Sequence, residues 1–67
     1  MATRNDGVFI HQDQDFELRL INGEVIGFIP KDGVDCELHY GSPERAKSIW
    51  PGLAEEIDAA VAKAHVQ

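Results

Sequence analysis

The sequence predicts an α+β domain: a four-stranded antiparallel meander sheet with one or two C-terminal helices packed on one face. Between Val8 and Tyr40, apolar and polar residues alternate with the period of two that is typical of strands. Two dipeptides, Asn22-Gly23 and Asp32-Gly33, divide this stretch and favour tight hairpin turns. From Ser42 onward, apolar residues recur every three or four positions, which indicates helix.

The first strand is expected within Gly7 to Gln12. Val8 and Ile10 share one face of this strand. Phe9 and His11 share the other face, and the sequence leaves open which pair points toward the core.

The Asn22-Gly23 turn predicts a hairpin in which Leu20 faces Val25, because both turn residues must adopt the positive φ of a type I′ turn. This register puts one set of apolar residues on a single face of the sheet: Phe16, Leu18, Leu20, Val25 and Ile29.

The Asp32-Gly33 turn can close with two residues or with three. A two-residue turn places Ile29 opposite Cys36, and it adds Cys36 to the same apolar face. A three-residue turn would instead point three polar side chains into that layer, which costs several kcal/mol in lost hydration. We therefore expect the two-residue turn, with Val25 opposite Tyr40 and with Cys36 as an inert core thiol under the helices.

A helix is expected to begin at Ser42, whose hydroxyl can cap free amides ahead of Pro43 and Glu44. Trp50-Pro51 interrupts it, because the residue before a proline is disfavoured in helical geometry. We expect Trp50 to plug one end of the core. A second helix should cover the sheet with an apolar stripe: Leu53, Ile57, Ala60, Val61 and Ala64.

The 67 residues predict one small domain. Its expected parts are a flexible N-terminus over 1–6, the meander over 7–40 and a helical segment over 42–65, with a loose end after Ala64. The polar opening and the short apolar stretches predict neither a signal peptide nor a membrane helix, and the single cysteine excludes an internal disulfide. We expect a cytoplasmic protein that does not contact membranes.

The chemistry-bearing residues do not form a recognisable catalytic or cofactor motif. Twelve acidic residues against six basic ones give a net charge of −6, which disfavours direct binding to nucleic acid. His11, His39 and His65 fall on three different elements without metal-ligand spacing. We therefore expect no enzyme, no metal site and no cofactor.

Two helices can cover only one face of the sheet, so the other face is the expected contact surface. Ile26 and Phe28 lie at its centre, on a middle strand. The candidate partner-binding residues are Ile26, Phe28, Ile21, Arg19, Glu17, Glu37 and His39. The expected partner is another protein or a second copy of the chain, as a homodimer.

The leading functional hypothesis is a small acidic regulator or inhibitor, of bacterial or phage type, that acts by protein contact. One alternative is a nucleic-acid mimic that inhibits a nuclease or a phage-defence complex, because residues 13 to 37 hold seven acidic residues against Arg19 and Lys31. The other alternative is a small enzyme or metal-binding protein that uses His39.

Residues 28–50 combine short strands, a helix start with the sequence Gly-Ser-Pro-Glu-Arg-Ala and a tryptophan soon after it. In these features they resemble the small MbtH-like accessory proteins of peptide synthetases. Those proteins carry a Ser-x-Trp-Pro element within the strands, whereas Trp50-Pro51 here lies in the helical part. The resemblance therefore implies no functional residue in this chain.

Overall fold

The computed structural model of the chain describes residues 6–66. The N-terminus that we expected to be flexible, 1–6, lies outside the described residues except for Asp6. In chain order the elements are β1 (Val8–Gln12), β2 (Glu17–Ile21), β3 (Glu24–Lys31), β4 (Val34–Gly41), α1 (Pro43–Ile49), the 3-10 turn η1 (Pro51–Leu53) and α2 (Ala54–Val66). The sheet order is β1-β2-β3-β4 with antiparallel neighbours, so the predicted α+β meander is confirmed.

Both hairpin turns have two residues, as predicted. Asn22 and Asp32 have φ values of 54° and 55°, and the glycine that follows each has a φ of 79°. These are the paired positive φ values of type I′ turns. Leu20 pairs with Val25, and Ile29 pairs with Cys36, so both registers are confirmed. One detail differs: a bulge near the end of β4 puts Gly41, not Tyr40, opposite Val25.

A second irregularity, in β1, settles the face of the first strand. The pairing with β2 shifts between Phe9 and His11. Ile10 is buried in the core and Val8 packs beside it, while Phe9 is 50% exposed. The guanidinium of Arg19 lies 5.8 Å from the centre of the Phe9 ring on the outer side.

Helix α1 begins where the capping signal predicts. The backbone N–H of Arg45 donates to Oγ of Ser42 at 3.3 Å, and Trp50 leaves helical geometry ahead of Pro51. Helix α2 buries Ile57 and Ala60 against the sheet. It continues to Val66, so the loose end that we expected after Ala64 is instead helical.

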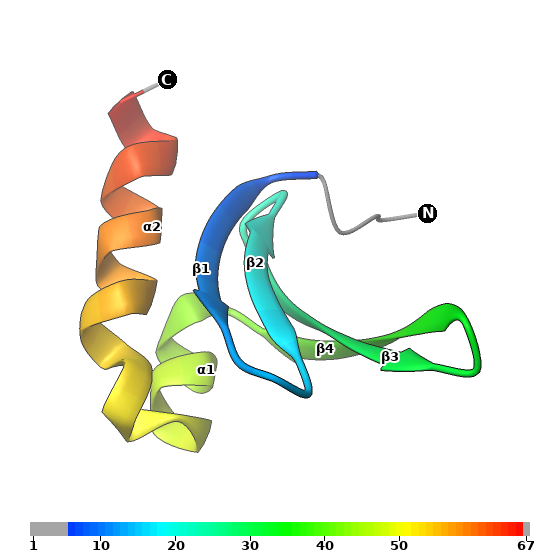
Figure 1. Cartoon of the computed structure of the whole chain (residues 1–67). Helices are drawn as coiled ribbons and strands as arrows, with labels where there is room; N and C mark the ends of the chain where they lie inside the picture. Colours follow the sequence, from blue (N-terminus) through cyan, green and yellow to red (C-terminus); the bar gives the residue numbers. More distant parts are fainter. Residues whose placement is uncertain (1–5, 67) are drawn as a thin grey trace.

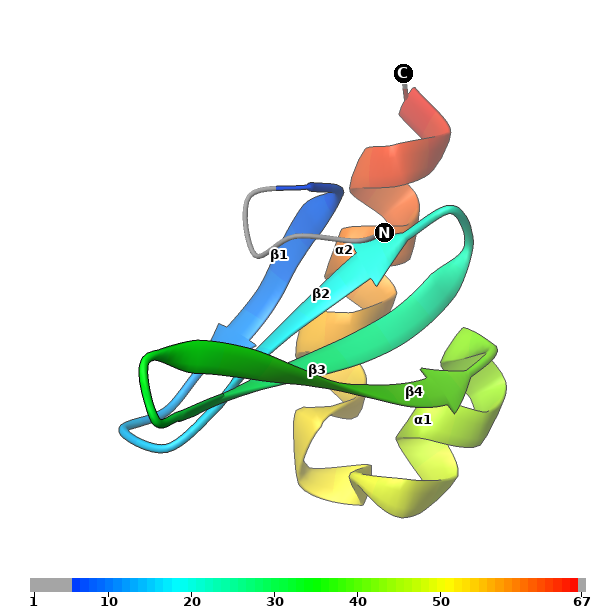
Figure 2. The same ribbon diagram turned by 90° about the vertical axis from the view of Figure 1, so that its right-hand side faces the viewer.

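Both helices lie on one side of the sheet, and the β3–β4 turn projects away from them (Figures 1 and 2). The main core fills the space between the helices and the sheet. Its buried members are Ile10, Leu18, Leu20, Val25, Ala46, Ile57 and Ala60. None of the helices in the described part of the chain is both long enough and apolar enough to cross a bilayer.

The opposite face of the sheet was predicted to be exposed, and this prediction is wrong. Ile21, Ile26 and Phe28 form a second buried cluster, with exposed fractions of 8%, 3% and 1%. The sheet is strongly curved, and its strands bend away from the helices around this face (Figure 1). The backbone of Gly7 also lies against Ile21, since a Cβ on Gly7 would come within 2.6 Å of the Ile21 side chain. The prediction assumed that only the helices could cover a face of the sheet.

The turn assignment predicts the effect of one substitution. Gly23→Ala should lower the free energy of unfolding by ~1–2 kcal/mol, because an L-residue with a side chain is strained at a φ of 79°. No atom lies within 4 Å of the added Cβ, so the loss would come from the backbone alone. Chemical denaturation followed by circular dichroism measures it.

Gly52→Ala is the matched control, because Gly52 has open space around it and no positive φ. It should not lower the unfolding free energy. Equal losses in the two variants would contradict the turn assignment.

Candidate functional site

The outer part of the β3–β4 hairpin, residues 29–36, is a two-stranded arm. Pairing between β2 and β3 ends at Glu17 and Phe28, so Ile29, Pro30 and Lys31 have β4 as their only neighbouring strand. Neither helix extends over this part in either view (Figures 1 and 2). The arm therefore lacks the third strand or the packed helix that usually stabilises a hairpin in water.

One side of the arm is apolar and uncovered. We call it the arm face; it consists of Ile29, Val34 and Cys36, together with Leu38 where the arm joins the three-stranded part of the sheet. Val34 is 67% exposed, Leu38 is 42% exposed, and Cys36 is exposed as well. The prediction that Cys36 is a core residue is therefore wrong, although the register that led to it is confirmed.

Cys36 is exposed because the helical layer is too short to reach it. Helix α1 has seven residues, a length of about 10 Å, and packs against the C-terminal end of β4. Helix α2 packs mainly against β1. The same face is thus core at one end of the sheet and surface at the other.

Three aromatic rings stand at the inner end of the arm face. The Trp50 ring stacks on Phe16 with a centroid distance of 5.4 Å, and it meets Tyr40 edge-on at 6.0 Å. All three rings are partly buried and pack against the main core. The prediction that Trp50 plugs one end of the core is confirmed. Tyr40 lies over Gly27, the residue opposite Leu38, on the same side of the sheet as the arm face.

The seven predicted site residues do not form one surface. Ile21, Ile26 and Phe28 are buried, as described above. On the same side of the sheet, Nε of Arg19 forms an ion pair with the buried carboxylate of Glu17. Glu37 and His39 remain on the outside, on β4.

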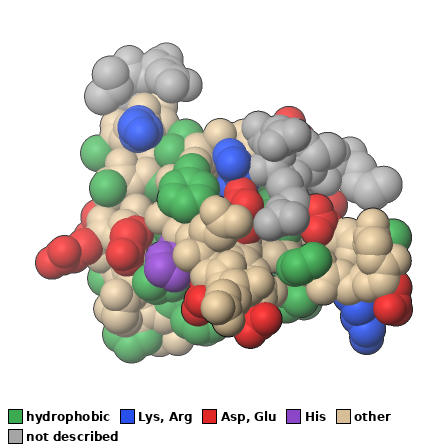
Figure 3. Space-filling view, viewed as in Figure 1, with side chains coloured by type: hydrophobic (Ala, Val, Ile, Leu, Met, Phe, Trp, Pro, Cys, Tyr) green, Lys and Arg blue, Asp and Glu red, His purple; other side chains and the backbone are tan. Residues whose placement is uncertain are grey.

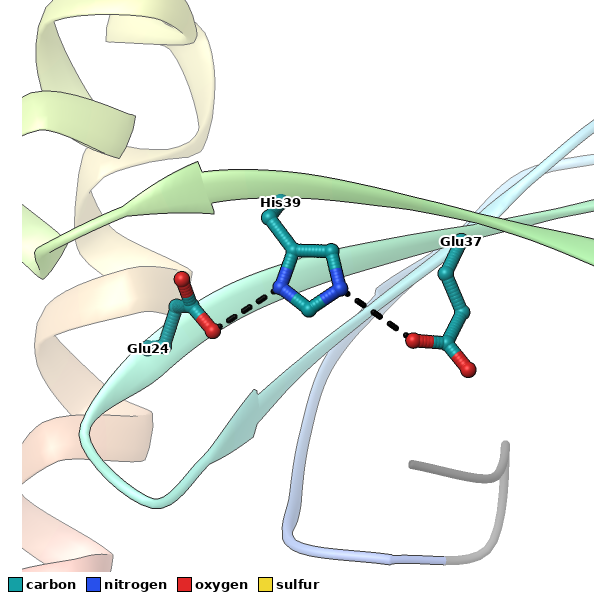
Figure 4. Close-up of polar contacts among 3 residues, drawn as sticks. All are labelled: Glu24, Glu37 and His39. Atoms are coloured by element: carbon teal, nitrogen blue, oxygen red, sulfur yellow. Dashed lines mark hydrogen bonds and ion pairs between the residues drawn. The ribbon is translucent and has the colours of Figure 1, made fainter. Parts of the chain in front are cut away.

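His39 lies between two carboxylates (Figure 4). Its Nδ1 is 2.9 Å from Oε1 of Glu24 on β3, and its Nε2 is 3.2 Å from Oε1 of Glu37 on β4. The hydrogen bond with Glu24 is the main cause that raises the pKa of His39 above 6.5, and Glu37 adds to it. The two carboxylates thus favour the protonated form of the ring, which links the two strands.

This arrangement does not form a metal site, because each ring nitrogen already meets a different carboxylate. Among residues 6–66, no three His, Cys, Asp or Glu side chains are grouped to hold an ion.

The ion pairs on this side of the sheet also bear on the hypothesis of nucleic-acid mimicry. Of the seven acidic residues that this hypothesis uses, Glu17 faces Arg19, while Glu24 and Glu37 face His39. Their charges are partly compensated within the chain, which weakens the case for mimicry.

Charged side chains gather at the tip of the arm, and hydrophobic side chains reach the surface between the helices and that tip (Figure 3). An open groove of about 540 Å³ lies elsewhere, between the C-terminal half of α2 and the ends of β1 and β2. Val8, Leu20, Pro43 and Val61 give it apolar walls, and His65 lies at its α2 side. No sequence signal predicts this groove, because its walls come from elements that are distant in the sequence.

Comparison of the chain with protein-family models, with curated proteins and with solved structures finds no match.

The exposure of Cys36 predicts fast labelling by a thiol reagent in the native protein. In dilute protein the native rate should approach the rate in denaturant. A matched variant with Cys36→Ala and Ala46→Cys places the thiol at a position with no exposed surface, so its labelling should require unfolding. Protection of Cys36 equal to that at position 46 would show that the arm face is covered.

The contacts of His39 predict its titration. Glu24→Gln should lower the pKa of His39, and Glu37→Gln should lower it less, because Glu24 is the larger cause. Histidine NMR signals followed across pH measure both changes. Glu44→Gln, on α1, is the control and should leave the His39 titration unchanged.

The same contacts give a pH dependence of stability. Because the folded-state pKa of His39 is raised, its contribution is full below about pH 6.5 and is lost as pH rises through the raised value. Glu24→Gln should reduce this loss. An equal pH dependence in parent and variant would show that the contact does not stabilise the fold.

Proposed function

We propose that this protein is a small acidic binding protein, a regulator or inhibitor that acts by contact with another protein rather than by catalysis. The contact surface is the arm face together with the aromatic rings at its inner end. This surface replaces the opposite face of the sheet, whose central residues are buried.

The observation that carries the proposal is an apolar row on an arm that nothing in residues 6–66 covers. An isolated hairpin is marginally stable in water, and large apolar groups such as Val34 and Leu38 favour burial. A protein that docks on the arm face would supply the missing layer. Contact would then stabilise the arm and bury its apolar side chains together.

The aromatic rings give this surface an anchor. Tryptophan and tyrosine are enriched among the residues that dominate binding energy, particularly where their surroundings already exclude water. Trp50 is held between Phe16 and Tyr40, so it can bind without first losing much conformational freedom. The acidic groups of β4 point to the other side and leave the apolar row uninterrupted.

The single cysteine places a probe on this surface. A benzophenone attached to Cys36 should cross-link a defined protein in an extract of the native cells, and excess unlabelled parent should compete for it. Unlabelled Leu38→Asp should compete poorly, because it puts a charge on the arm face. Cross-linked products are identified by mass spectrometry.

The control carries the same probe on α2, at Ala62→Cys in a Cys36→Ala background, where position 62 is exposed. It should not give the product. Equal products from both positions, or equal competition by parent and Leu38→Asp, would contradict the proposal.

A further inference from the structure

The two edges of the arm differ in their capacity to accept another strand. The outer edge of β3 carries Pro30 and Lys31, and both residue types discourage strand pairing. Strand β4 is eight residues long, forms the edge of the sheet, and contains neither proline nor lysine. Its edge is therefore the one suited to extend the sheet.

The hairpin register fixes which backbone groups face that edge. Residues that flank a two-residue turn exchange both hydrogen bonds, so the backbone groups of Val34 point toward Lys31, and those of Cys36 and Leu38 also point toward β3. The backbone groups of Glu37 and His39 consequently point outward. They are the donors and acceptors that a further strand would meet.

We propose that β4 pairs antiparallel with β4 of a second copy of the chain, with Leu38 opposite Leu38 across a two-fold axis. The proposal rests on the proposed function, because it names an occupant for the arm. It would join two four-stranded sheets into one of eight strands.

Charge favours a second copy and selects the register. Pairing must match outward residues with outward residues, and any register whose two-fold axis passes through a residue of β4 satisfies this condition. Centring on Cys36 sets Asp35 against Glu37, and centring on Glu37 sets that residue against itself. Centring on Leu38 sets Glu37 of each copy against His39 of the other. Opposite charges across strands stabilise pairing and like charges oppose it, so the Leu38 register is preferred.

The same register buries apolar surface reciprocally. Leu38 meets its counterpart at the centre, and Cys36 lies opposite Tyr40 of the second copy. The outer part of each arm, which lacks a helical layer, then runs toward the end of the other copy that carries Tyr40 and Trp50. Each copy would thus bury part of the apolar surface on the arm of the other.

A charge-swap experiment tests self-pairing. His39→Glu puts two acids at positions 37 and 39, and the double variant Glu37→Lys with His39→Lys puts two lysines there. Each variant alone should sediment as a monomer, whereas the equimolar mixture should form a dimer with affinity about tenfold or more above either alone. Circular dichroism confirms that each variant is folded.

Disulfide formation tests the register without charged substitutions. Positions opposite each other in a non-hydrogen-bonded pair have Cα atoms about 4.5 Å apart, a distance that a disulfide can span. Leu38→Cys in a Cys36→Ala background should oxidise to a covalent dimer. The parent, whose Cys36 lies opposite Tyr40, should oxidise much more slowly under the same conditions.

Parent protein that sediments as a monomer at high concentration would overturn self-pairing, as would faster dimer formation through Cys36 than through Leu38→Cys. These results are separable from failure of the proposed function. A monomer whose probe at Cys36 still captures a competed partner retains the arm face as a binding surface for a different protein.

Discussion

The two-residue turn at Asp32-Gly33 is the constraint on which both sides of the arm depend. It fixes the pairing of Ile29 with Cys36, and strand alternation then assigns every later residue of β4 to a side until the bulge at Tyr40. Val34, Cys36 and Leu38 face the helical side because of that turn. Glu37 and His39 take the other side, where His39 meets Glu24. A turn one residue longer would exchange these sets.

The helical layer is shorter than the apolar face that the turn defines, so part of that face stays uncovered. Helix α1 and the aromatic rings cover the end of β4 nearest Tyr40, while α2 covers β1 and β2. The hairpin extends beyond both helices (Figure 1). The fold thus presents an apolar row as a continuation of its own core, and this continuity is the reason why we propose the arm as a binding surface.

Most of the local structure could be predicted from the sequence. The Asx-Gly pairs specify both hairpins and their registers, and Ser42 with Pro43 specifies the start of α1. These signals are local, since each depends on a few neighbouring residues. The bulges in β1 and at Tyr40 carry no comparable signal.

The candidate site could not be predicted from such local signals. Phe28 is buried and Cys36 is exposed because of the curvature of the sheet and the reach of the helices, which depend on packing of the whole domain. The sequence places each residue on a side of the sheet but does not say where each side is covered. Glu37 and His39 are the predicted site residues that keep a place at the proposed interface.

The central claim is that the outward edge of β4 is a pairing edge. Amide hydrogen exchange measured at low and high protein concentration tests it most directly. The amides of Glu37 and His39 should exchange quickly in dilute protein and become protected at high concentration, while Leu38, bonded within the hairpin, should be protected in both. Exchange at Glu37 and His39 that does not change with concentration would contradict the claim.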